Sequence, residues 1–147
     1  SDERAVDAVL DGPDGALAFT LPMGDKKLPC IAAEDIGKCA FGIFKKGREY
    51  IGKTVAIAGE HLTGTEMAAA MTKAFGQPVR YNAVTPEQYR GFGFPGADDL
   101  GNMFQFKRDF NEAFCGPRNP AVARSLNPAL LTFDAWLAQN KSRIPLT

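Results

Sequence analysis

The sequence predicts an α/β fold, a small domain with a short sheet and about five helices. Three observations lead to this class. Short apolar runs typical of strands alternate with longer segments in which apolar residues recur at helical spacing. Two of the longer segments begin with a capping box, at Thr63 and at Thr85. Between residues 54 and 83, strand, helix and strand patterns follow one another at the length of a βαβ unit.

The first part of the chain predicts two strands in quick succession. Residues 1–15 are polar and turn-rich, and we separate them from a domain of residues 16–147. Residues 16–21 and residues 28–32 are short apolar runs bounded by turn residues, and each predicts a short strand.

A helix is expected to start near residue 34. Its first turn would carry Glu34 and Asp35, whose carboxylates suit the positive end of the helix dipole. Gly47 is a suitable stop. Apolar residues at helical spacing give this helix one apolar face, made of Ile36, Ala40, Ile43 and Phe44.

The centre of the chain carries the clearest pattern. Residues 54–58 predict a buried strand. The helix that begins after Thr63 ends at Gly76, a residue type favoured just beyond a helix. Residues 79–83 predict another strand. The two strands of this central βαβ unit should be parallel and joined by a right-handed crossover.

The C-terminal part is predicted to be mainly helical. Thr85 caps a short helix that has Pro86 in its first turn. Residues 97–114 predict one long helix, and residues 115–120 predict a turn-rich break. Thr132 is expected to cap a last helix.

Composition and charge narrow the function classes. Hydrophobic residues make up 45% of the 147 residues, and 17 basic side chains balance 17 acidic ones. A net charge of zero gives no electrostatic footprint for nucleic acid and little repulsion between copies, so we expect self-association and no nucleic-acid partner. We find neither a membrane span nor a signal peptide, and therefore expect a cytoplasmic protein without a membrane partner.

Side chains that serve elsewhere as catalysts or metal ligands are isolated in this sequence. His61 is the only histidine and has no evident nucleophile beside it. The carboxylate pairs at residues 34–35 and 98–99 are sequence neighbours at helix starts. In that position carboxylates more often interact with the helix dipole and solvent than act in acid–base catalysis. The cysteines match no zinc or redox spacing and are expected to be small buried side chains: Cys30, Cys39 and Cys115. We assign no catalytic, cofactor-binding or metal-binding residue.

Two strings imitate phosphate-binding loops. Residues 91–96, GFGFPG, match G-x-G-x-x-G but follow a predicted helix instead of a strand, and Pro95 removes one backbone N–H. Residues 59–65 resemble a P-loop, but Thr65 stands where that loop needs Lys. We interpret the first string as a turn between helices and the second as part of the Thr63 helix cap.

Residues 92–106, FGFPGADDLGNMFQF, form the most unusual stretch of the chain. Its aromatic and Met content suits the wall of an apolar pocket or a partner surface. It also suits a core helix entered through a Gly/Pro turn, which is the commoner use of such side chains. The candidate residues for a pocket or partner surface are Phe92, Phe94, Pro95, Met103, Phe104 and Phe106.

Several segments carry a family resemblance. They are AEDIG (33–37), YIGKT (50–54) followed by the Thr63 cap, GFPGA (93–97) with DL (99–100) and NMF (102–104), LNP (126–128) and TFDAWL (132–137). Together they resemble the C-terminal half of the NmrA-like family, in the atypical short-chain dehydrogenase/reductase superfamily. The resemblance runs from about residue 16 to residue 141.

The resemblance implies that an NAD(P)-binding Rossmann half normally precedes this part, and that the chain is a truncated, substrate-side portion. NADP(H) is the implied cofactor of full-length relatives, and none is implied for this chain. The implied role is part of a redox-sensing or regulatory protein, with the missing Rossmann half or another protein as partner. The alternatives are the substrate-binding half of an NAD(P)H-dependent reductase, or a stand-alone structural module. Catalytic Tyr and Lys residues of active relatives would lie in the missing half, so we expect no enzyme activity from this chain alone.

Overall fold

The central strand of the fold is the apolar segment β2 (Leu17–Leu21), in which four of five side chains are buried. The computed structural model describes residues 9–11 and 16–146. In a three-stranded sheet of order β1-β2-β5, β2 pairs antiparallel with β1 (Val9–Asp11) and parallel with β5 (Val79–Ala83). A second sheet pairs β3 (Leu28–Cys30) with β4 (Glu60–Leu62), antiparallel.

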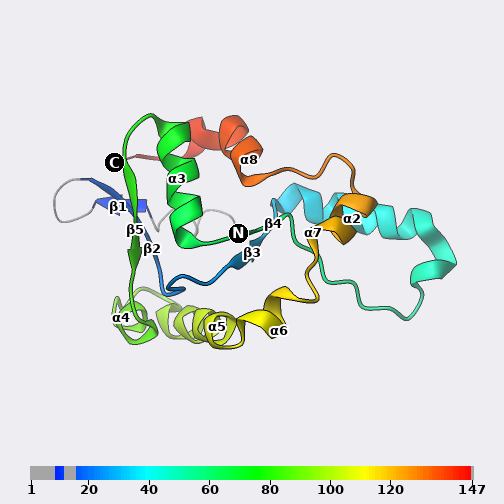
Figure 1. The fold of residues 1–147 in the computed structure, drawn as a ribbon, viewed down its shortest axis with the longest axis horizontal. Coiled ribbons are helices and arrows are strands. Elements are labelled where there is room, and N and C mark those ends of the chain that lie inside the picture. The colour runs from blue at the N-terminus through cyan, green and yellow to red at the C-terminus, as the bar shows by residue number, and fades with distance from the viewer. Residues whose placement is uncertain (1–8, 12–15, 147) are drawn as a thin grey trace.

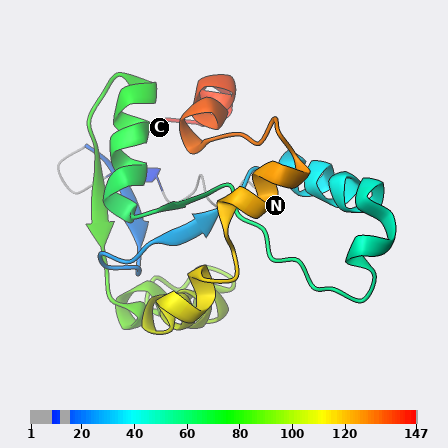
Figure 2. The same cartoon turned by 45° about the vertical axis from the view of Figure 1, so that its right-hand side comes forward.

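The helices surround the sheets from several sides (Figure 1). Helices α3 and α8 lie beside the larger sheet, α4 and α5 lie at the end where β5 finishes, and α2 and α7 lie far from that sheet (Figure 2). Their bounds are α2 Ala33–Lys46, α3 Gly64–Phe75, α4 Pro86–Arg90, α5 Ala97–Asp109, α6 Asn111–Cys115, α7 Pro120–Leu126 and α8 Phe133–Asn140, with 3-10 turns η1 Gly47–Tyr50 and η2 Lys141–Arg143.

Side-chain caps position the helices as the sequence predicts. The Thr63 hydroxyl accepts from the Glu66 backbone N–H at 3.1 Å, and the Glu66 carboxylate accepts in return from the Thr63 N–H at 2.8 Å. Thr85 caps α4 with the same reciprocal pair of hydrogen bonds, and Thr132 caps α8. Gly76 ends α3 in the left-handed conformation that glycine adopts without strain. These predictions are confirmed.

The apolar core has two separate parts. The larger core cluster joins β2, β5, α3 and α8, with Phe19, Met67 and Leu137 among its buried members. The smaller core cluster lies between α2 and α7, around Cys39 and Leu126. The α/β fold class is confirmed, and the two clusters explain why one end of the molecule is a layered α/β unit whereas the other is a helix pair.

The predicted strand at residues 54–58 is wrong. These residues lie between η1 and β4 without secondary structure, and the parallel partner of β5 is β2. The predicted βαβ unit is therefore built with a different first strand. A strand needs a neighbour that pairs with its backbone, and no strand in the described residues pairs with residues 54–58.

The predicted apolar face of α2 is partly buried only at Ile43, which packs on the smaller core cluster. The buried residues of this helix are Asp35, Cys39 and Gly42, which pack toward α7. Ile36 and Phe44, on the adjacent side, are exposed. The helical period is correct, but the side of α2 that carries Ile36, Ala40 and Phe44 is exposed.

The predicted long helix at residues 97–114 breaks at Phe110, which leaves the helical region with φ −111° and ψ 38°. The Asn111 side-chain amide donates to the Lys107 carbonyl at 3.0 Å and to the Lys27 carbonyl at 2.8 Å, so it competes with regular helical pairing. The five predicted helical segments are all present, with this one divided into α5 and α6.

Helix α7 and strands β1 and β4 were not predicted from the sequence. Helix α7 follows the expected break, and its start has an Asn119 cap and Pro120 at the first position. Strand β1 lies inside the segment of residues 1–15 that the sequence marks as polar and turn-rich. The rest of that segment, with the turn at residues 12–15, lies outside the described residues.

Candidate functional site

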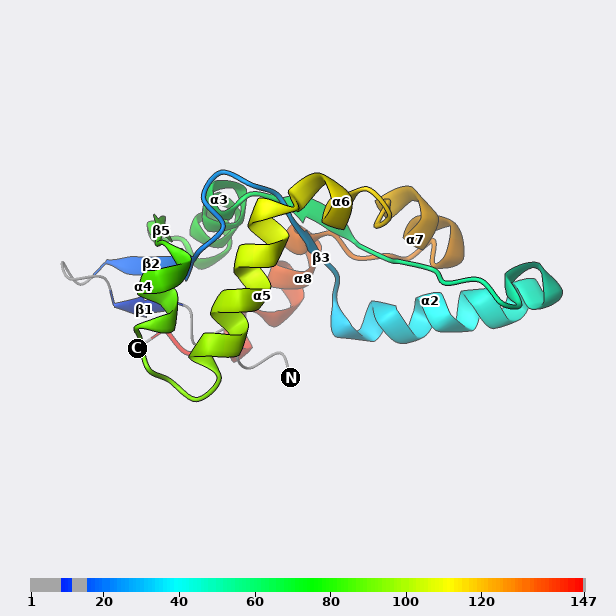
Figure 3. The same ribbon diagram turned by 90° about the horizontal axis from the view of Figure 1, so that it is seen from below.

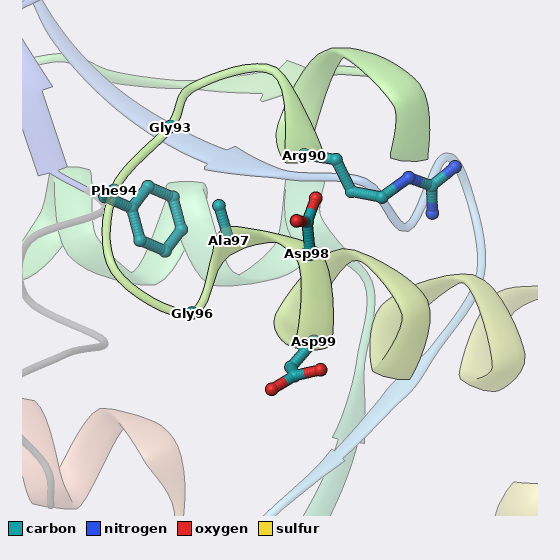
Figure 4. Close-up of a pocket in the computed structure, with 7 residues that line it drawn as sticks. All are labelled: Arg90, Gly93, Phe94, Gly96, Ala97, Asp98 and Asp99. Atoms are coloured by element: carbon teal, nitrogen blue, oxygen red, sulfur yellow. The ribbon is translucent and has the colours of Figure 1, made fainter.

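The glycine-rich string of residues 91–96 is the turn between α4 and α5, as the sequence predicts. Gly93 and Gly96 have φ values of +69° and +87°, which side chains with a Cβ rarely adopt. The turn borders a pocket of about 350 Å³ (Figure 4). Its lining residues are Arg90, Gly93, Phe94, Gly96, Ala97, Asp98 and Asp99.

The charges of this pocket do not suit a phosphate group. Asp98 and Asp99 occupy the first turn of α5, where a bound anion would need free N–H groups and no negative charge. In Figure 4 the Arg90 guanidinium extends to the side away from Phe94. It donates to Asn102 at 3.0 Å and to Gln105 at 2.9 Å, so its role is to join α4 to α5.

Tyr89 organises the aromatic residues around the turn. Its ring makes edge contacts with Phe92, Phe94 and Phe104, at centroid distances of 5.8, 5.6 and 5.6 Å. Phe104 is only 9% exposed and belongs to the larger core cluster, whereas Phe92 is 54% exposed. Burial of the Tyr89 ring raises the pKa of its hydroxyl above the ordinary value.

The six candidate surface residues therefore divide. Phe104 lies in the core, and the other five are exposed: Phe92, Phe94, Pro95, Met103 and Phe106. Phe92, Phe94 and Pro95 come from the turn, while Met103 and Phe106 lie on α5. Part of the stretch at residues 92–106 therefore lies in the core and part lies at the surface. The interpretation as a core helix describes Phe104, and the interpretation as a pocket wall or partner surface describes the exposed residues.

A second aromatic group joins the candidate Phe106 to residues outside the candidate set. Phe106 contacts Phe110 and Phe114 at centroid distances of 5.2 and 6.5 Å. The Arg118 guanidinium lies 3.8 Å from the Phe114 ring centre, and the Lys107 ammonium lies 5.1 Å from it. Desolvation and the nearby Arg118 charge lower the pKa of Lys107. The spacing of Phe106, Phe110 and Phe114 by four residues is the sequence signal for this group.

The residues of the apparent P-loop have structural roles. Glu60 and His61 lie in β4 and Thr63 caps α3, so the string is a short strand followed by a helix cap and not a phosphate-binding loop. The Glu60 carboxylate accepts from the Phe133 N–H at 2.6 Å. His61 donates from Nε2 to the Arg118 carbonyl at 2.7 Å, which fixes the ring against the segment before α7.

Asp35 differs from the expectation for the pair at residues 34–35. Glu34 is exposed as expected, but Asp35 is fully buried. Its carboxylate accepts from the Asn127 side chain at 2.9 Å and from the Leu131 N–H at 2.8 Å, and the Lys38 ammonium lies 3.4 Å away. The carboxylate therefore joins the start of α2 to the segment after α7. This structural role goes beyond the favourable interaction with the helix dipole that the sequence predicts.

The cysteines are all free, and Cys39 is fully buried as expected. Cys30 and Cys115 are half-buried. Burial, together with the Glu60 charge, raises the pKa of the Cys30 thiol to about 11. Among the described residues, no group of three or more His, Cys, Asp or Glu side chains is placed to hold a metal ion. The described helices include none with the length and apolar character needed to cross a membrane.

Comparison with known proteins decides the family. The model of the NmrA-like family matches residues 7–137, most of the chain. The chain belongs to the NmrA-like family. Two curated relatives share sequence with this NmrA-like chain. It is 39% identical over 94 residues to an NAD(P)H azoreductase of Xenophilus azovorans, a match that covers 58% of this chain and 32% of the relative.

The second relative is a regulator. This NmrA-like chain is 36% identical over 89 residues to the nitrogen metabolite repression protein nmr of Neurospora crassa, which covers 53% of this chain and 18% of that protein. A solved structure of NmrA, a negative transcriptional regulator, in complex with NADP has a TM-score of 0.67 and 21% identity. The likeness covers 89% of this chain and 45% of NmrA. The NmrA-like chain thus spans a third or less of the two curated relatives.

The link through Asp35 joins two of the family-like segments of this NmrA-like chain. Asp35 belongs to AEDIG, and its partner Asn127 belongs to LNP, 92 residues later. These two segments therefore stabilise one structural joint, between α2 and the segment after α7.

Proposed function

We propose that this chain is the C-terminal, substrate-side part of an NmrA-like NAD(P)-binding redox-sensor or regulatory protein of the cytoplasm. In that role the chain forms one wall of the ligand pocket and binds the surface of another part of the protein or of another protein. It performs no catalysis by itself. The observation that carries the proposal is the group of exposed aromatic side chains on the α4–α5 turn, held in place by the buried Tyr89 ring.

The aromatic side chains and charges of the α4–α5 turn favour one wall of a shared pocket over a ligand site formed by this chain alone. Phe92 and Phe94 present apolar surface to solvent, yet their rings are fixed by edge contacts instead of being free to collapse inward. Rigid exposed aromatic groups suit contact with a planar ligand or with another protein. Because the carboxylates of Asp98 and Asp99 border the pocket, we infer that NADP(H) phosphates are held by the part of the protein outside this chain.

A second candidate is the substrate-binding part of an NAD(P)H-dependent reductase. The identity of 39% to an azoreductase supports it. Both candidate functions use the same pocket wall and the same cofactor. They differ only in whether the assembled protein turns over a substrate.

A hybrid protein tests the proposal. In this hybrid, our chain replaces the matching region of the Xenophilus azovorans azoreductase. We expect the hybrid to bind NADPH, measured by the change in nicotinamide fluorescence. Reduction of an azo dye by the hybrid favours the reductase candidate, and cofactor binding without turnover favours the sensor. A hybrid that folds but does not bind NADPH contradicts the proposal.

Single substitutions in the hybrid test the wall itself. We expect Phe94→Ala to weaken binding of the azo dye by at least about tenfold, because the ring would lose its contact with a planar ligand. Phe110→Ala is the matched control, since Phe110 is also an exposed phenylalanine but lies at the other end of α5. Equal effects of the two substitutions contradict a wall at the turn.

A further inference from the structure

The aromatic rings at the end of α5 and on α6 form a surface patch outside the pocket of the α4–α5 turn. Phe106 is 54% exposed and Phe110 is 58% exposed, and Phe106 contacts both Phe110 and the half-buried Phe114. Figure 3 views the molecule from the side on which α5 and α6 lie. Because the rings pack on one another, they present a fixed apolar surface to solvent.

Two positive charges lie on the Phe114 ring, from the Arg118 guanidinium and the Lys107 ammonium. The Arg118 group is close enough to stack on the ring, and it donates one hydrogen bond to the Phe114 carbonyl. A stacked guanidinium keeps further N–H groups at its edge, where they can meet a carboxylate. The ring therefore holds both cations at the surface instead of leaving them on free chains.

Lys27 brings a third positive charge to the same place. Its backbone carbonyl accepts from the Asn111 amide at 2.8 Å and from the Cys115 thiol at 3.6 Å, so the turn before β3 lies against α6. Burial raises the pKa of Cys115, and the Arg118 and Lys27 charges oppose that rise. Both charges therefore act on the same side chain of α6.

These three cations have no counter-charge within the described part of the chain, where none of them forms an ion pair. Asp109 pairs with Arg108 at 2.8 Å, and Glu112 is exposed to solvent. Cations gathered around one ring repel each other, and an anion placed between them would relieve that repulsion. The patch thus combines exposed apolar surface with uncompensated positive charge.

We propose that this patch binds an acidic peptide segment of a partner protein, in which carboxylates alternate with apolar side chains. The inference rests on the protein-binding role proposed above and gives that role a surface separate from the pocket wall. The patch is called the cation–aromatic face below, and its members are Lys27, Phe106, Lys107, Phe110, Phe114 and Arg118.

The chemistry of the cation–aromatic face favours a peptide over a membrane or a nucleic acid. A peptide can place its carboxylates on the cations while its apolar side chains cover Phe106 and Phe110. An anionic bilayer is a negative plane that would also meet the carboxylates of Asp109 and Glu112. A nucleic-acid strand carries a long row of phosphates, whereas this face is short and the whole chain has no net charge.

A fluorescein-labelled peptide that repeats Glu-Glu-Phe-Leu is the probe, and its fluorescence anisotropy reports binding to the 147-residue chain. We expect saturable binding with a Kd of about 10–100 μM at low salt, and at least about fivefold weaker binding in about 0.5 M sodium chloride, because salt screens exposed charges. A peptide with Gln in place of Glu, and one with Ser in place of Phe and Leu, should each bind at least about tenfold more weakly.

Substitutions on the chain locate the binding site. Lys107→Gln removes one charge at nearly constant length and should weaken peptide binding about three- to tenfold. Lys53→Gln is the matched control, because the Lys53 ammonium also lies over a ring, 5.7 Å from the centre of Tyr50, but outside the face. Phe110→Ser, at an exposed position, should weaken binding similarly and tests the face even where Lys107→Gln lowers stability. Equal affinities of the two Gln variants and the unchanged chain overturn the inference.

The outcomes separate this inference from the proposed function. A hybrid protein that binds NADPH but not the acidic peptide overturns the cation–aromatic face and leaves the pocket wall standing. A hybrid that binds neither overturns both. Sedimentation of the chain with vesicles of equal parts phosphatidylcholine and phosphatidylserine, or tighter binding to a polythymidine strand than to the peptide, overturns the choice of a peptide partner.

Discussion

Asp35 is the residue on which the α2 end of the molecule depends most directly. Its buried carboxylate accepts two hydrogen bonds from groups more than 90 residues away in sequence, on Asn127 and Leu131. Without the carboxylate, those donors would remain buried without an acceptor, which costs more than the loss of an exposed hydrogen bond. A carboxylate near a helix start can be found in the sequence, but its distant partners cannot.

The Asp35→Ala substitution is therefore expected to lower the free energy of unfolding by about 2–4 kcal/mol. Urea denaturation followed by circular dichroism measures the change. The neighbouring Glu34→Ala is the control, because Glu34 is exposed, and it should change stability by no more than about 0.5 kcal/mol. Similar losses for the two variants would show that Asp35 acts only through the helix dipole.

Cys30 gives a second prediction for a single residue. Burial and the Glu60 charge raise the pKa of its thiol to about 11, so the thiol form dominates at pH 9. Since the thiolate is the reactive species, the alkylation rate of native Cys30 should still rise with pH between pH 8 and pH 10. Mass spectrometry after iodoacetamide treatment measures the rate at each pH. A rate that levels off near pH 9 contradicts the raised pKa.

Among the elements, helix caps and apolar periods were predictable, whereas the partner of each element was not. Thr63, Thr85 and Thr132 mark their helices because a cap depends on residues within one turn. The strand expected at residues 54–58 has the right local character, but pairing depends on a neighbour that the sequence of the segment does not contain. For the same reason, the sequence does not reveal that the apolar side of α2 is largely exposed.

The packing of α2 on α7 predicts opposite effects for two identical substitutions in one helix. A Cβ at Gly42 would overlap the backbone carbonyl of Leu126, so Gly42→Ala should destabilise the chain by about 1–3 kcal/mol as the helices separate. A Cβ at Gly37 meets nothing, so Gly37→Ala should stabilise by about 0.5–1 kcal/mol through helix propensity. Thermal unfolding of both variants checks the signs. A stabilising Gly42→Ala contradicts the close approach.

For the whole molecule, the exposed apolar side chains of α2 and the zero net charge together predict concentration-dependent self-association of the isolated chain. These side chains are Ile36, Phe41 and Phe44. Light scattering after size exclusion should give a mass that increases with concentration. Phe44→Glu should reduce this increase, because it places a charge in the exposed apolar group of α2. Ala69→Glu, at an exposed position of α3, is the control and should not reduce it. A monomer at every concentration contradicts this expectation.

The family could be inferred from the sequence because short segments such as AEDIG and TFDAWL keep their order along the chain, and the match over residues 7–137 agrees. The candidate surface was predictable only in part. The stretch at residues 92–106 is aromatic throughout, but only the fold separates Phe104, which packs on Tyr89 in the core, from Phe92 at the surface.

Titration of NADPH into the isolated chain and into the hybrid protein, by calorimetry, tests most directly that this chain is a part whose cofactor site lies elsewhere. We expect no saturable binding to the isolated chain up to about 1 mM NADPH, a limit that corresponds to about −4 kcal/mol, and saturable binding to the hybrid. Micromolar binding to the isolated chain that is lost on Gly96→Val, in the turn between α4 and α5, would contradict this account.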